Sequence, residues 1–119
     1  MKKILLFTLV MVFIFSAVSM AHPPQNLNVK FNMEDKMLTV EVTHNVGGSN
    51  TSHYVDEIIV THKDEEIVMQ KPGQQLKNKE IFYYYMPGIK DGDQISINTV
   101  CSIQGSRSID YTITSATDN

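Results

Sequence analysis

Apolar and polar residues alternate along most of this chain, and a period of two is typical of β-strands with one buried face. Leu27, Val29 and Phe31 show the pattern, with asparagine and lysine at the positions between them. Beyond the N-terminal apolar run, no stretch keeps apolar side chains at helical spacing. Turn-forming pairs of residues separate the alternating segments. The pattern predicts seven strands, over residues 27–31, 38–43, 54–61, 67–69, 81–86, 95–101 and 109–113.

Short strands, frequent turns and the lack of a predicted helix indicate an all-β protein. The natural packing for such a pattern is an immunoglobulin-like antiparallel β-sandwich of about seven strands. Glu34-Asp35 makes a short turn between the first two strands, so we expect those strands to pair as a hairpin. Residues 22–119 contain no repeat and no low-complexity segment, and we expect them to form a single domain.

Residues 1–21 have the features of a secretory signal peptide. Lys2 and Lys3 precede an apolar run from Ile4 to Ala17, and small residues up to Ala21 offer a cleavage site. The run is shorter than the ~20 residues that a membrane span needs, and no second apolar run follows. We therefore expect a bacterial Sec-type signal, a periplasmic or secreted protein, and no membrane anchor after cleavage.

Composition limits the partners and the stabilising devices. Removal of the first 21 of the 119 residues would leave 98, with 8 Lys and Arg against 13 Asp and Glu, a net charge of −5. Such an acidic chain is a poor partner for nucleic acid. Cys101 is the single cysteine, so an internal disulfide is impossible. A lone cysteine in an exported protein is a buried thiol, an intermolecular partner or a functional thiolate.

Candidate metal ligands stand at the ends of predicted strands. His44 follows the second strand, His53 precedes the third, and a loop rich in glycine, serine and asparagine joins them. Cys101 ends the sixth strand. Because strand ends in a sandwich can cluster at one end, the two imidazoles and the thiolate could reach one point. Thiolate and imidazole together suit iron, copper or zinc.

The segment HNVGGSNTSHYVDEIIV, followed later by VCSIQG, resembles the iron domain of superoxide reductases and desulfoferrodoxins. The resemblance implies an immunoglobulin-like sandwich that reduces superoxide by one electron at ferrous iron. In that family four imidazoles and one thiolate hold the iron. The resemblance assigns metal-ligand roles to His44, His53 and Cys101, makes Gly105 the glycine that closes the motif, and matches His22 to the family's N-terminal histidine.

Two positions depart from the family pattern. Gln104 stands where the family has its last histidine, and Asn45 stands where a proline usually follows the first loop histidine. A glutamine amide is a poorer iron ligand than an imidazole, so metal binding is better supported than enzymatic activity. A reductase of this kind would also need an external electron donor, because the chain lacks the cysteines of a rubredoxin-type centre.

Two other functions fit the same residues. If cleavage follows Ala21, the α-amine and imidazole of His22 could chelate one metal together, which predicts a non-catalytic periplasmic copper or zinc carrier. The third hypothesis is a metal-free sandwich that serves as an interaction module. His62 stands beside the polar pair Lys63-Asp64, and we expect it to be solvated and not a ligand.

Overall fold

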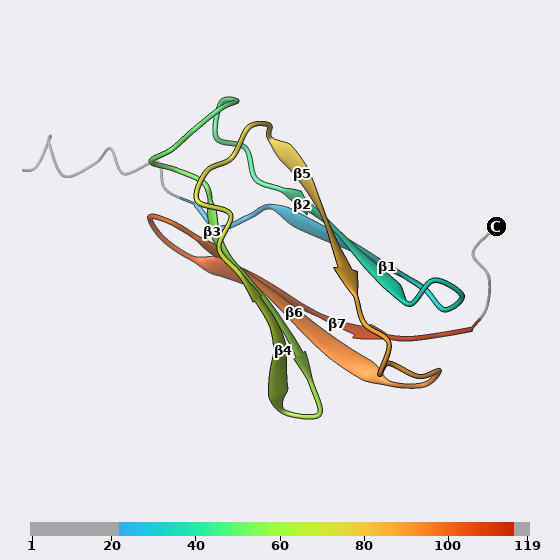
Figure 1. Cartoon of the computed structure of the whole chain (residues 1–119). Coiled ribbons are helices and arrows are strands. Elements are labelled where there is room, and N and C mark those ends of the chain that lie inside the picture. The colour runs from blue at the N-terminus through green and yellow to red at the C-terminus, as the bar shows by residue number, and fades with distance from the viewer. Residues whose placement is uncertain (1–21, 116–119) are drawn as a thin grey trace, which may run out of the picture.

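Seven antiparallel strands form two facing sheets in the computed structural model, which describes residues 22–115 (Figure 1). The predicted signal peptide, residues 1–21, lies outside the described residues. The described part of the chain forms no helix, and so none long and apolar enough to cross a membrane. The strands are β1 (Asn26–Asn32), β2 (Met37–Thr43), β3 (Val55–His62), β4 (Glu65–Gln70), β5 (Lys79–Tyr85), β6 (Gln94–Cys101) and β7 (Ser106–Thr112).

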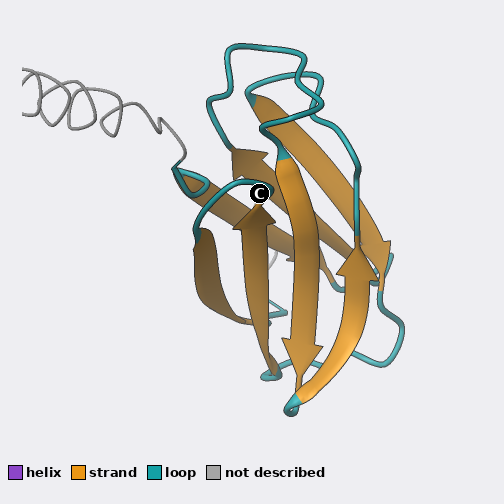
Figure 2. Cartoon of the chain, turned by 90° about the vertical axis from the view of Figure 1, so that its left-hand side faces the viewer, coloured by secondary structure: helices purple, strands orange, loops and turns teal. Residues whose placement is uncertain are grey.

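The strand order confirms the predicted sandwich. One sheet has the order β1-β2-β5 and the other has the order β4-β3-β6-β7. Every paired neighbour is antiparallel, and the β1–β2 hairpin is present as expected. The chain crosses from one sheet to the other between β2 and β3, between β4 and β5, and again between β5 and β6, as in an immunoglobulin-like fold. Figure 2 shows the two layers of strands and the loops at their ends.

Alternate residues of each strand point into the space between the sheets and form the core. In β2 the inward residues are Leu38, Val40 and Val42, and all three are buried. Burying one such side chain stabilises the fold by roughly 1.5–3 kcal/mol relative to leaving it exposed. The opposite sheet supplies the facing side chains, and the fully buried apolar ones include Ile58, Val60, Ile95 and Ile97.

The turn between β3 and β4 is shorter than the sequence suggested. The predicted strands, 54–61 and 67–69, leave a polar connection that includes Lys63 to Glu66, but only Lys63 and Asp64 lie between the observed strands. Both have positive φ angles, 51° and 64°, which is the backbone of a two-residue hairpin turn that matches the strand twist. Glu65 therefore pairs directly with His62, and the exposed Glu65 and Glu66 begin the edge strand β4.

Strand registers bring several chain segments to one end of the sandwich. In the first sheet Asn26 pairs with Thr43, so the start of β1 lies beside the end of β2. In the second sheet Val55 pairs with Cys101, so β3 starts where β6 ends. The Arg107 Nε, at the start of β7, donates to a carbonyl just before β1 over 2.7 Å, which joins the two sheets at this end. Residues that precede β1, follow β2 and precede β3 are therefore neighbours.

A hydrogen bond between the sheets closes the side where β4 and β5 are edge strands. The Tyr84 hydroxyl of β5 donates to Gln70 Oε1 of β4 over 2.7 Å. Burial raises the pKa of Tyr84 above its usual value, so the hydroxyl keeps its proton and remains a donor.

Replacing Tyr84 by phenylalanine should lower the free energy of unfolding by about 1 kcal/mol, because the hydrogen bond is lost while the ring still packs. Tyr83→Phe is the matched control, since the neighbouring tyrosine is 63% exposed and points away from the core. Urea unfolding of both variants measures the difference. Equal stability of the two variants would show that the bond between the sheets contributes nothing.

Candidate metal centre

Three histidines meet at the end of the sandwich where the segments converge. His22 precedes β1, His44 follows β2 and His53 precedes β3. One ligand atom of each lies within 4.8 Å of the ligand atoms of the other two. The ring centroids are 4.7–5.3 Å apart, and the ring planes are steeply inclined to one another, at 70–89°. We call these residues the histidine triad, and all three were candidates from the sequence.

His44 is the buried member of the triad and has no exposed surface. Its backbone N–H donates to the Asn78 carbonyl over 2.8 Å, just after the register of β2 ends. On its ring, Nδ1 lies 3.0 Å from Gln75 Oε1 and Nε2 lies 3.1 Å from the His22 carbonyl oxygen. Burial, more than any other cause, holds the pKa of His44 below its usual value. Its imidazole therefore favours the neutral form, which is the form that binds metals.

The loop from His44 to His53 is shaped by local hydrogen bonds. Gly47 and Gly48 have φ angles of 80° and 101°, which glycine adopts without strain and which let the loop turn back. Asn50 Oδ1 accepts the backbone N–H groups of Ser52 and His53, over 2.9 and 2.7 Å. These hydrogen bonds fix the backbone position of His53 at the end of the loop.

The His53 ring presents an unsatisfied nitrogen. Its Nε2 is buried and has no hydrogen-bond partner among the described residues. A buried polar atom without a partner costs about 1–3 kcal/mol, so an ion or a ligand that occupied this position would relieve the cost. The unpartnered Nε2 of His53 and the proximity of the His22 and His44 rings both indicate a ligand position between the three imidazoles.

His22 is held to the fold by its own side chain. Its Nε2 lies 3.0 Å from the Asn45 carbonyl oxygen, and its Nδ1 lies 3.1 Å from the Pro23 carbonyl oxygen and 3.3 Å from Gln25 Nε2. Gln25 Oε1 also accepts the Asn45 N–H over 2.9 Å, which fixes the orientation of the Gln25 amide. His22 is thus held in place beside His44 and His53.

The segment that carries His22 passes under the turn between β6 and β7. Gly105 in that turn has a φ of 87°, and a Cβ added there would lie 3.0 Å from the Pro23 side chain. The Gly105 carbonyl accepts the Cys101 N–H over 2.9 Å, which closes the turn. A glycine is needed at 105 both for its backbone conformation and for the close approach of the chain before β1.

Cys101 lies near the triad without being part of it. Its side chain is buried on the inner face of β6, and its Cα pairs with that of Val55, two residues after His53. Its sulfur is not among the ligand atoms that lie within 4.8 Å of one another. Gln104 is exposed in the turn between β6 and β7.

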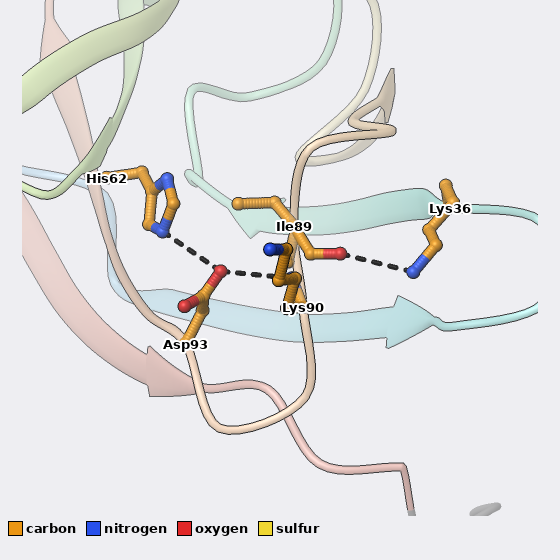
Figure 3. Close-up of polar contacts among 5 residues, drawn as sticks. All are labelled: Lys36, His62, Ile89, Lys90 and Asp93. Atoms are coloured by element: carbon orange, nitrogen blue, oxygen red, sulfur yellow. Dashed lines mark hydrogen bonds and ion pairs between the residues drawn. The ribbon is translucent and has the colours of Figure 1, made fainter.

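His62 lies at the far end of β3 and contacts a carboxylate. Its Nε2 is 3.1 Å from Asp93 Oδ2, and its side chain is only 14% exposed, so the expectation of a solvated residue was wrong (Figure 3). The backbone N–H of Lys90 also donates to Asp93, and this hydrogen bond is the main reason that the pKa of Asp93 lies below its usual value. A surface hollow lined partly by His62, Asp93 and Asp110 is at this end, away from the triad.

The donor atoms of the triad fit a transition metal. Three imidazoles without a carboxylate among them suit zinc, copper, iron or nickel, and they disfavour calcium and magnesium, which prefer oxygen ligands. The triad could therefore hold a metal ion. His22 and His53 are partly exposed, so an ion can reach the site from solvent.

The chain matches no protein-family model and no curated protein sequence. Among solved structures it is similar to a superoxide reductase from Nanoarchaeum equitans, at 11% sequence identity and a TM-score of 0.45. The matched region covers 77% of this chain and 92% of that chain. A likeness of this size does not assign a function, so the case for a metal site rests on the three histidines.

Gly105→Ala should destabilise the protein by about 1–3 kcal/mol, because the added methyl meets the rigid Pro23 ring and the alanine must adopt a left-handed backbone. Gly92→Ala is the matched control, since Gly92 has a similar φ of 83° but no atom within 4 Å of an added Cβ. Thermal unfolding compares the two variants. The close packing of the segment before β1 would be contradicted if Gly92→Ala were the more damaging substitution.

Proposed function

We propose that this protein binds a single transition-metal ion through the imidazoles of His22, His44 and His53. The observation that carries the proposal is the mutual approach of their ligand atoms to within 4.8 Å from three separate chain segments. The unsatisfied Nε2 of His53 supports it, because a metal would replace the missing hydrogen-bond partner. Burial supports it further, by favouring the neutral and metal-binding form of His44.

The members of the triad contribute to metal binding in different ways. His44 is a rigid ligand, since its ring Nδ1 contacts Gln75 and its backbone N–H donates to the Asn78 carbonyl. His53 supplies a nitrogen that no other group occupies. We further propose that residues 1–21 direct export to the periplasm or beyond. Cleavage after Ala21 would then add the α-amine of His22 as a fourth nitrogen donor.

Metal titration of the purified protein tests the proposal. Zn²⁺, Cu²⁺ and Fe²⁺, titrated separately, should each bind in a 1:1 ratio, and copper should bind most tightly of the three divalent ions. His53→Gln should weaken Zn²⁺ binding by about tenfold or more, because it replaces an imidazole ligand by an amide side chain of comparable size.

His62→Gln is the matched control, because His62 lies at the opposite end of β3 and should leave Zn²⁺ affinity unchanged. Circular dichroism of each variant checks that the fold persists. If the wild type bound no metal, or if His62→Gln and His53→Gln weakened binding equally, the triad would not be the site.

A second candidate function concerns the iron-loaded protein. Cys101 ends β6 at the same end of the sandwich as His53, and this placement favours the hypothesis that its thiolate joins the imidazoles on iron. Ferrous iron would supply one electron, and two protons would convert superoxide to hydrogen peroxide. An external electron donor would then have to reduce the iron again, since this chain holds no second redox centre in its described residues.

The visible spectrum of the oxidised iron protein separates the two functions. If Cys101 binds the iron, the ferric protein should show a thiolate-to-iron charge-transfer band, and Cys101→Ser should abolish the band while three imidazoles still retain metal. Cys101→Ala, which also fills the buried position, is the companion variant. A ferric protein without this band would overturn the superoxide-reductase hypothesis and leave imidazole binding intact.

A further inference from the structure

Gln75 is a polar side chain buried directly behind the histidine triad. It is 1% exposed and lies in the connection between β4 and β5. Its amide nitrogen donates two hydrogen bonds, to the carbonyls of His44 and Lys77, both over 2.6 Å. Its amide oxygen lies 3.0 Å from the His44 Nδ1. Every hydrogen-bonding atom of the side chain is therefore engaged, and two of its three contacts involve a member of the triad.

These contacts determine which way the amide points. If the oxygen and nitrogen of Gln75 were exchanged, the amide oxygen would face the carbonyl oxygens of His44 and Lys77 at 2.6 Å. Neither oxygen–oxygen contact would have a proton to form a hydrogen bond. Buried acceptors that face each other are costly. The oxygen must therefore face His44, and His44 must supply the proton at Nδ1.

The assignment leaves the other nitrogen of His44 with a lone pair. In a neutral imidazole only one nitrogen carries a proton, so a proton on Nδ1 makes Nε2 an acceptor. Nε2 then faces the His22 carbonyl oxygen at 3.1 Å with no proton between them. A cation beside these two atoms would remove the repulsion, whereas a second proton would bury a positive charge among three imidazoles.

The same residue also supports the loop that carries His53. The backbone of Gln75 forms an isolated β-bridge with Asn50, through hydrogen bonds of 2.7 and 2.9 Å. Asn50 in turn accepts the His53 N–H through its side chain, over 2.7 Å. One residue thus touches the His44 ring with its side chain and supports the His53 loop with its backbone.

We propose that Gln75 is a positioning residue of the metal site, and that it fixes His44 in the tautomer protonated on Nδ1 so that Nε2 binds the metal. This inference rests on the proposed function for the identity of the site. It adds a residue and a ligating atom that the metal-ligand pattern in the sequence does not contain.

Nitrogen-15 NMR of the metal-free wild-type protein tests the tautomer without any metal. The His44 ring should show a protonated Nδ1 and an unprotonated Nε2. Gln75→Met, which keeps the length of the side chain and removes its hydrogen bonds, should shift His44 toward a mixture of tautomers. A wild-type protein with the proton on Nε2 would overturn the proposal, even if the variant failed to fold.

Zn²⁺ affinity supplies the second readout. Gln75→Met should weaken binding by about 10–100-fold, the range seen when the hydrogen-bond partner of a ligating histidine is removed. Gln74→Met is the matched control, because the neighbouring glutamine is exposed and makes no hydrogen bond to the triad, and this variant should bind Zn²⁺ as the wild type does.

The two proposals fail in different ways. If the wild type bound no Zn²⁺, the metal-binding function would be wrong, whatever the tautomer of His44. If the wild type bound Zn²⁺ and the folded Gln75→Met variant bound it equally well, the positioning role of Gln75 would be wrong and the function would stand.

Discussion

The antiparallel register of the two sheets is the constraint on which the site depends. Because Asn26 pairs with Thr43, the segment before β1 must lie beside the residues that follow β2. Val55 pairs with Cys101, so β3 starts where β6 ends. The hydrogen bond from Arg107 to the segment before β1 then brings this end of the second sheet to the same end of the sandwich. A slip of one residue in β2 would turn His44 away from the core, since neighbouring side chains on a strand face opposite sides.

The triad also shows how a small fold can hold polar groups in its interior. His44 and Gln75 are fully buried, every hydrogen-bonding atom of the Gln75 side chain is engaged, and His44 Nδ1 has its partner in Gln75. His53 differs, because its Nε2 lacks one. Because buried polar atoms nearly always have a partner in folded proteins, the unpartnered Nε2 of His53, beside two further imidazoles, marks the position at which a ligand is expected.

Much of this fold could be predicted from the sequence, because alternation such as Leu38, Val40, Val42 depends on which side chains are buried. The turn after His62 was placed wrongly, since Glu65 and Glu66 are polar for an edge strand and resemble a loop. His44 and His53 were identified because they stand at the ends of predicted strands, and His22 because the resemblance to superoxide reductases implies an N-terminal histidine. Gln75 was missed, because a single glutamine in a polar connection carries no pattern, and only the folded chain brings it to His44.

X-ray absorption spectroscopy of the zinc-loaded protein tests the central claim most directly, because it identifies the atoms bound to the metal. Binding by the triad predicts a shell that includes three nitrogens at about 2.0–2.1 Å, with the multiple scattering typical of imidazole rings. A shell made of sulfur and oxygen, without imidazole scattering, would contradict the claim that His22, His44 and His53 form the site.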